Sequence, residues 1–131
     1  MISIKTAEEI EAMREPCAIT RDVLDLLGRS LREGMTTAEL DRIAFEFIKD
    51  CGAEPAFLGY CGYPASACIS LDDMVVHGIP NDKQVIKEGV IVSIDVGAVK
   101  NGFVGDAARS FYVGDISAEK KKLIDVTREC F

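Results

Sequence analysis

The chain has 131 residues, of which 48% are hydrophobic and 28% are charged; this composition is typical of one folded domain over residues 1–131 and excludes a disordered chain. The formal net charge of −7 makes nucleic acid an unfavourable partner. No apolar run reaches the ~18 residues of a membrane span and Met1 to Lys5 lacks a signal-peptide core, so we expect a cytoplasmic protein with no membrane partner.

Two helices are predicted at the start of the chain. Thr6 to Glu9 has the pattern of a capping box, and apolar residues recur at helical spacing from Ile10 to Leu31. We expect Pro16 to kink this long first helix. Thr36 to Glu39 repeats the capping pattern, and Gly52 ends the second helix because glycine readily adopts the left-handed C-cap conformation. The apolar stripe of this helix consists of Leu40, Ile43, Ala44 and Phe47.

A loop from Ala53 to Pro64 follows, and it is rich in glycine, proline and aromatic residues. Its three aromatic side chains either line an apolar binding pocket or cover the core; they are Phe57, Tyr60 and Tyr63. Beyond the loop, Ala65 to Leu71 is predicted as a strand and Asp72-Asp73 as a turn. We expect a second, short strand over Met74 to Val76.

His77, the only histidine of the chain, follows this short segment and precedes Gly78-Ile79-Pro80. A lone histidine at the end of a strand is often a hydrogen-bonded structural residue. A rigid Gly and Pro loop would instead present the imidazole to a cleft, where it could stabilise developing negative charge. Pairing of His77 with Cys61 or Cys68 would suggest a thiol nucleophile, but no third residue is evident to orient the histidine.

The next segment predicts a β-hairpin. Its two strands run from Ile91 to Gly97 and from Phe103 to Phe111, on either side of Asn101-Gly102. Asn-Gly is the strongest short-range hairpin signal, because both residues tolerate the positive φ of a type I′ turn.

Two aspartates lie on one face of this hairpin in either possible register. With Asn101-Gly102 as the loop, Asp106 faces Gly97 and lies diagonal to Asp95; a loop shifted to Lys100-Asn101 places Asp106 directly opposite Asp95. Both registers separate the two Cβ atoms by roughly 4.5 to 8 Å. Carboxylates this close repel each other unless a cation or a shared proton lies between them. The pair is therefore either a divalent metal site or two acids that align on a solvated sheet face.

Ser117 is expected to cap a last helix with Leu123, Val126 and Cys130 on one face. Helices that precede an antiparallel sheet predict an α+β fold. The five cysteines are odd in number and contain no Cys-x-x-Cys pair, which indicates free thiols in a reducing compartment rather than disulfides or a structural zinc site.

Three blocks of the sequence together resemble the type I methionine aminopeptidases. They are Gly59 to Ser70, Val75 to Pro80, and Ile94 to Gly97 continued through Gly105-Asp106. The blocks follow the order found in that family, and the likeness extends from the opening Ile2 to Thr6 to the end of the chain.

The resemblance implies the pita-bread fold, an antiparallel sheet with helices on one face, and metal-dependent removal of N-terminal methionine from peptides and nascent proteins. Asp95 and Asp106 match two ligands of a site for two divalent ions, which are Co, Mn, Fe or Zn. His77 matches the histidine that contacts the scissile peptide. The methionine pocket of the family corresponds to Phe57, Tyr60, Tyr63 and Cys68.

The family fold has two similar halves, and the resemblance covers only the N-terminal one. The missing ligands, a histidine and two glutamates, belong to the other half, so we expect weak or absent metal binding and an inactive chain by itself. An alternative is a non-catalytic interaction module with the same fold. A third hypothesis is that two copies associate through the surface that the missing half would cover.

Overall fold

The structure, a computed structural model, describes residues 4–131; Met1 to Ser3, part of the opening segment in which we found no signal-peptide core, lies outside the described residues. The elements in chain order are α1 (Ala7–Ser30), α2 (Thr37–Asp50), β1 (Glu54–Pro55), the 3-10 turn η1 (Tyr60–Gly62), β2 (Ala67–Leu71), β3 (Ile91–Lys100), β4 (Phe103–Tyr112) and α3 (Ala118–Cys130). The order of helices and strands confirms the predicted α+β class.

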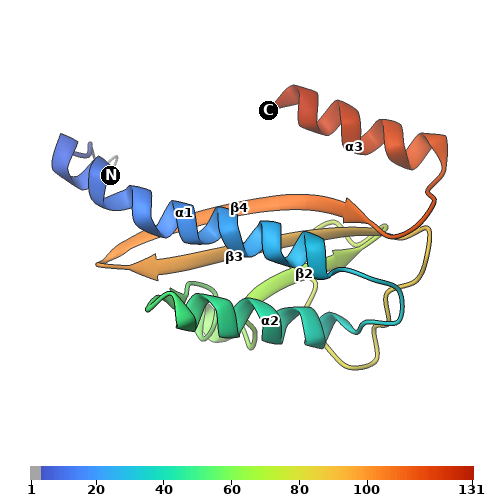
Figure 1. The fold of residues 1–131 in the computed structure, drawn as a ribbon, viewed down its shortest axis with the longest axis horizontal. Coiled ribbons are helices and arrows are strands. Elements are labelled where there is room, and N and C mark those ends of the chain that lie inside the picture. The colour runs from blue at the N-terminus through green and yellow to red at the C-terminus, as the bar shows by residue number, and fades with distance from the viewer. Residues whose placement is uncertain (1–3) are drawn as a thin grey trace.

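The strands form one antiparallel sheet in which β3 is central. β4 pairs with one edge of β3, and both β2 and the short β1 pair with its other edge. Helices α1 and α2 lie side by side along the sheet (Figure 1). The core between helices and sheet is made of Leu24, Leu27, Leu40, Ile48, Ile69, Val92, Ile94 and Val96. The alternate residues of β3, including Asp95, therefore face away from this core.

Both predicted capping boxes are present. The Glu9 amide donates to Thr6 Oγ1 at 3.2 Å while the Glu9 carboxylate accepts from the Thr6 amide, and Thr36 and Glu39 repeat this exchange at the start of α2. Gly52 follows α2 with φ +65°, as expected for its end. Pro16 lies inside α1, and the kink expected there stays a prediction.

The hairpin has the first of the two registers considered above. Asn101 and Gly102 form the loop, with φ values of +53° and +81°. Asp106 consequently pairs with Gly97, and the alternative register, with Asp106 opposite Asp95, is wrong. Side chains around the loop fix the hairpin tip on α1, because Asn101 Nδ2 donates to the Glu15 carboxylate at 3.0 Å.

The short strand expected over Met74 to Val76 is absent. After the turn at Asp72-Asp73 this segment has no strand partner, and Val75 and Val76 are largely exposed. The reason lies just beyond it, because the free edge of β2 bonds to Gly78 instead: the Ile69 amide donates to the Gly78 carbonyl at 2.8 Å. Residues Met74 to Val76 are therefore part of a loop that returns to β2.

The last helix begins as predicted, with Ser117 Oγ accepting from the Lys120 amide. Its expected apolar face is exposed, since Leu123 and Val126 are 62% and 45% exposed, whereas Ile124 is the residue that packs inward. Lys120 Nζ ties the helix to the rest of the chain through the Asp72 carboxylate at 2.7 Å. Association of two copies through the exposed side chains stays a prediction.

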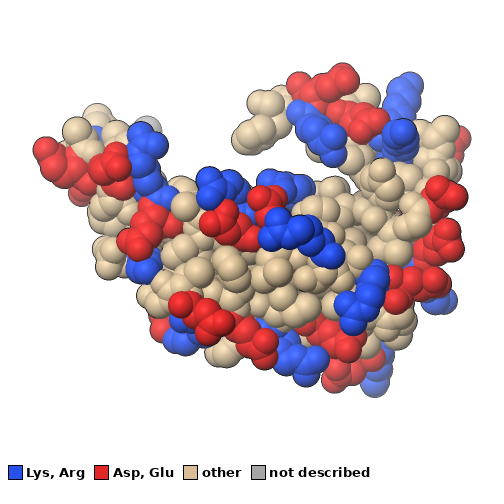
Figure 2. All heavy atoms as spheres, in the orientation of Figure 1, with Lys and Arg blue, Asp and Glu red and all other residues tan. Residues whose placement is uncertain are grey.

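Charged side chains of both signs are interspersed on the face drawn in Figure 2, without an extended basic patch there. In the part of the chain that the structure describes, none of the helices combines the length and apolar character that crossing a membrane requires.

Candidate active site

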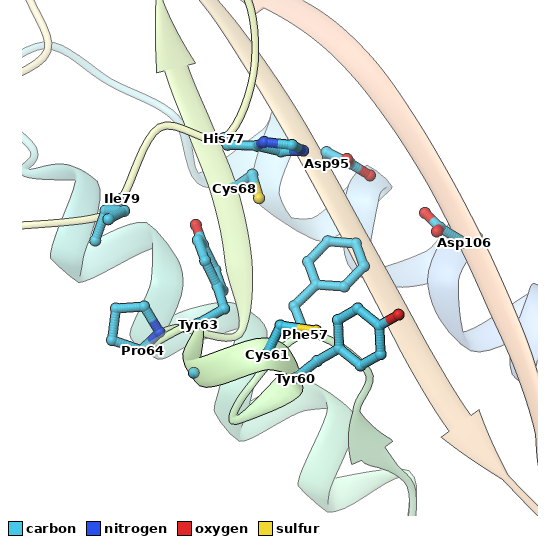
Figure 3. Close-up of a pocket in the computed structure, with 11 residues that line it drawn as sticks. Phe57, Tyr60, Cys61, Tyr63, Pro64, Cys68, His77, Ile79, Asp95 and Asp106 are labelled. Atoms are coloured by element: carbon cyan, nitrogen blue, oxygen red, sulfur yellow. The ribbon is translucent and has the colours of Figure 1, made fainter.

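The candidate residues singled out from the sequence all line one pocket of about 590 Å³ (Figure 3). It lies on the side of the sheet that faces away from the helical core. Its walls consist of Phe57, Tyr60, Cys61, Gly62, Tyr63, Pro64, Cys68, His77, Ile79, Asp95 and Asp106. Cys61 was considered only in the thiol-nucleophile hypothesis, and Gly62, Pro64 and Ile79 were not predicted as site residues. Pro64 and Ile79 carry no chemical signal of their own, but each is next to or near a predicted site residue in the sequence.

Asp95 on β3 and Asp106 on β4 supply the two carboxylates of the pocket. Asp106 pairs with Gly97, and glycine is required at that point: a Cβ on Gly97 would lie 2.9 Å from Ala56 Cβ and 3.1 Å from the Phe57 ring. The absence of this side chain lets the loop before η1 approach the strands. The aromatic wall and the carboxylates therefore share one cavity.

The pKa of Asp95 is raised to about 6, first by burial and then by the charge and hydrogen bonding of Asp106. The charge of His77 acts in the opposite direction, which places the imidazole within electrostatic reach of Asp95. Figure 3 shows the His77 ring directed toward Asp95. A carboxylate whose charge is destabilised by a neighbouring acid favours binding of a cation between the two.

Cys68 lies directly opposite Asp95 in the β2 and β3 pairing and is 6% exposed. Burial raises the pKa of its thiol; hydrogen bonding with Tyr63 offsets part of this rise, and the nearby Asp95 and Asp106 charges add to it. The thiol therefore stays protonated near neutral pH, which disfavours the thiol-nucleophile hypothesis for Cys68. Its contribution to the pocket is a small, weakly polar wall.

The aromatic side chains reach the pocket from the loop and from η1. Tyr60 is 73% exposed at the mouth, while the Tyr63 hydroxyl points inward and lies 3.1 Å from the Ala67 carbonyl and 3.2 Å from the Gly78 carbonyl. Burial raises the pKa of the Tyr63 phenol, which remains a neutral donor. Tyr63 thus connects the aromatic wall to β2 and to the loop that carries His77.

Asp41 on α2 supports the pocket from outside and was missed by sequence reasoning. Its Oδ1 accepts hydrogen bonds from the amides of Ser66 and Ala67, both at 2.8 Å. Burial raises the pKa of Asp41, and these two bonds offset part of that rise. The contact spans 25 residues of sequence, so no local signal identifies it.

The residues present fit a divalent cation in type but not in number. Carboxylate oxygens are suitable ligands for divalent ions, and Asp95 and Asp106 supply them. Within residues 4–131, however, no three His, Cys, Asp or Glu side chains come together as a metal-binding group. A complete metal site would therefore need further ligands.

Comparison with known proteins identifies the family. Residues 11–131 match the model of metallopeptidase family M24. The chain belongs to this family. The methionine aminopeptidase of Clostridium acetobutylicum is 50% identical over 131 residues, which are 100% of this chain and 52% of that protein. Methionine aminopeptidase 1 of Bacillus subtilis is 46% identical over 98% of this chain and 52% of its own length.

Solved structures of M24 relatives have the same architecture. The methionine aminopeptidase of Thermotoga maritima superposes with a TM-score of 0.96 at 41% identity, over 98% of this chain and 52% of that one. The prolidase of Pyrococcus furiosus has a TM-score of 0.84 at 28% identity, over 96% of this chain and 36% of that one. These matches confirm the predicted pita-bread architecture and the resemblance to methionine aminopeptidases.

The chain spans about half the length of the curated relatives it matches. Membership of M24, a family of metallopeptidases, implies the use of divalent metal. Three points stay predictions: the identity and number of the metal ions, the roles of the individual pocket residues, and the assignment of residues 1–131 to a single domain.

Proposed function

We propose that this chain contributes part of the active site of a methionine aminopeptidase, which removes the N-terminal methionine from peptides and nascent polypeptides. The observation that supports it best is the convergence of Asp95, Asp106, His77 and three aromatic side chains on one pocket. These residues come from four separate segments of the chain. The relatives named methionine aminopeptidase, which match nearly the whole chain, support the same assignment.

In this proposal Asp95 and Asp106 are two ligands of a site for two divalent ions, which are Co, Mn, Fe or Zn. The other ligands come from outside residues 1–131, because the described residues supply too few. When bound, such ions lower the pKa of a water molecule and polarise the substrate carbonyl. The raised pKa of Asp95 means that metal and proton compete for the same carboxylate.

The remaining pocket residues bind and orient the substrate. Phe57, Tyr60 and Tyr63 surround the methionine side chain, whose thioether packs favourably against aromatic rings. Cys68 completes the wall as a neutral thiol. His77 donates a hydrogen bond to the scissile peptide, and the same bond strengthens as negative charge develops on that group.

A chimera tests this proposal. Residues 1–131 are joined to the part of the Clostridium acetobutylicum methionine aminopeptidase that lies outside the matched region, and methionine release from a methionyl tripeptide is measured with Mn or Co. We expect activity from the chimera and none from the 131-residue chain alone. Asp95→Asn in the chimera should abolish release, whereas Asp73→Asn, in an exposed turn, should not.

The alternative is a non-catalytic interaction module. The incomplete donor set of the described residues is compatible with it, but the two adjacent carboxylates argue against it, because a module that binds no metal gains nothing from paired acids. It predicts that the chimera folds, as judged by a cooperative unfolding transition, yet releases no methionine at any metal concentration. That outcome would overturn the proposed aminopeptidase function.

A further inference from the structure

The backbone of Gly78, which follows His77, is held against β2 from three directions. Its amide donates to Ser70 Oγ at 3.1 Å, and its carbonyl accepts from the Ile69 amide at 2.8 Å and from the Tyr63 hydroxyl at 3.2 Å. The approach is so close that a Cβ on Gly78 would lie 2.1 Å from the Ile69 carbonyl oxygen. The loop is therefore fixed to the sheet at the residue next to His77.

His77 itself has φ +59°, in the left-handed region that costs free energy for any residue with a Cβ. A strained conformation persists only where surrounding contacts hold it. The hydrogen bonds to Gly78 hold the residue that directly follows His77. Without them, His77 can relax to a negative φ, and its imidazole would then leave the pocket.

Among the three groups that hold Gly78, Ser70 is the one side chain buried outside the pocket. It is 4% exposed and lies on the same sheet face as Cys68, two residues further along β2. A purely structural interpretation is that the hydroxyl only satisfies a buried amide. The hydroxyl also has a second effect, because its hydrogen bond to the Gly78 amide fixes the backbone next to the strained His77 and so the direction of the imidazole.

We propose that Ser70 is a positioning residue for His77, which it orients through the Gly78 amide. Ser70 is not among the residues that line the pocket. This inference extends the proposed function, because it identifies a residue that orients His77 toward the scissile peptide. Its catalytic part rests on the proposed function. The orientation of His77 itself can be measured without any activity.

Two variants of equal shape isolate the hydroxyl. Ser70→Thr retains it and Ser70→Val replaces it by a methyl group, so both place the same extra volume in the buried site. Ser93→Ala is the control, because Ser93 pairs with Ser70 on the neighbouring strand and bonds to Ser110 rather than to the loop. His77 is the only histidine of the chain, so its ring protons give a single assignable set of NMR signals.

Three readouts test the proposal on the 131-residue chain and on the chimera. In Ser70→Val we expect hydrogen exchange of the Gly78 amide to rise about tenfold, with that of the Ile94 amide in β3 unchanged. We expect loss of the nuclear Overhauser contacts between the His77 ring and the pocket. In the chimera kcat should fall about tenfold with little change in KM. Ser70→Thr and Ser93→Ala should behave as wild type in all three.

Unchanged Gly78 exchange and His77 contacts in Ser70→Val would overturn the proposal, as would equal effects of Ser93→Ala. An inactive wild-type chimera would contradict the proposed function instead. In that case the two NMR readouts would still decide whether Ser70 orients His77.

Discussion

Asp106 faces Gly97 across the hairpin, and Asp95 is diagonal to Asp106 on the same face of the sheet. This register leaves an open position beside the Asp106 carboxylate, which the Phe57 wall approaches from the other side. Carboxylates and aromatic side chains consequently share a cavity that no single segment of the chain could form.

The glycine opposite Asp106 should not tolerate a side chain. In Gly97→Ala the new Cβ would lie 2.9 Å from Ala56 Cβ, so the loop before η1 must move. We expect the free energy of unfolding to fall by about 1 to 3 kcal/mol, measured by urea denaturation. Asp73→Asn, in an exposed turn, is the control and should change it by less than about 0.5 kcal/mol. A Gly97→Ala variant as stable as wild type would contradict the close packing of this loop.

Removing the Asp106 charge should stabilise the metal-free chain at neutral pH. Burial and Asp106 raise the pKa of Asp95 from its usual 3.8 to about 6, so the folded chain binds the Asp95 proton more tightly than the unfolded chain. The contribution of Asp95 to the free energy of unfolding therefore falls as pH rises from about 4 to about 6 and stays low above that. Asp106→Asn removes part of the cause, and the variant should exceed wild type in stability at pH 7.

The measurement is the difference in unfolding free energy between Asp106→Asn and wild type at pH 4 and pH 7. A difference is required because Asp25 and Asp72 have lowered pKa values, held down by Arg109 and Lys120, and their contributions have the opposite pH dependence. Asp73→Asn serves as the matched control. The same difference at both pH values would show that Asp106 does not act on the titration of Asp95.

Metal binding by the 131-residue chain should be weak. Two carboxylates without further ligands place its affinity for Mn or Co in the class of weak carboxylate sites, with Kd on the order of 10⁻³ M or above. Isothermal titration calorimetry measures this directly. Micromolar binding that disappears in Asp95→Asn would contradict the expectation that the described ligand set is incomplete.

The half-buried Asp41 on α2 should be essential for the start of β2. Asp41→Ala leaves the amides of Ser66 and Ala67 without their acceptor, and each unsatisfied buried amide costs about 1 to 3 kcal/mol. We expect urea denaturation to show that the free energy of unfolding falls by the cost of one or two such unsatisfied amides. Asp50→Ala, at the exposed end of the same helix, should have little effect. Equal effects of the two substitutions would argue against a special role of Asp41.

Sequence reasoning predicted those parts of the molecule that depend on neighbouring residues. The capping boxes, the Asn101-Gly102 turn and the shared face of Asp95 and Asp106 all follow from short-range rules. The family resemblance added the pocket residues around His77, because it uses the order of several blocks at once.

The parts that sequence reasoning missed depend on tertiary placement. Nothing near Asp41 indicates that it bonds to the start of β2, and nothing near Ser70 indicates that a loop eight residues later returns to it. The strand expected at Met74 to Val76 was wrong for the same reason, since its apolar residues matched a strand but the returning loop left them without a partner. Ile124 packs inward instead of Leu123, and the helical spacing that the two residues share with polar neighbours did not distinguish them.

The central claim, that Asp95 and Asp106 jointly bind the metal, is tested most directly by the metal content of the chimera after gel filtration without added metal. We predict that wild type and Asp73→Asn retain bound divalent ion, and that Asp95→Asn and Asp106→Asn each lose most of it. Equal metal content in all four proteins would contradict the claim.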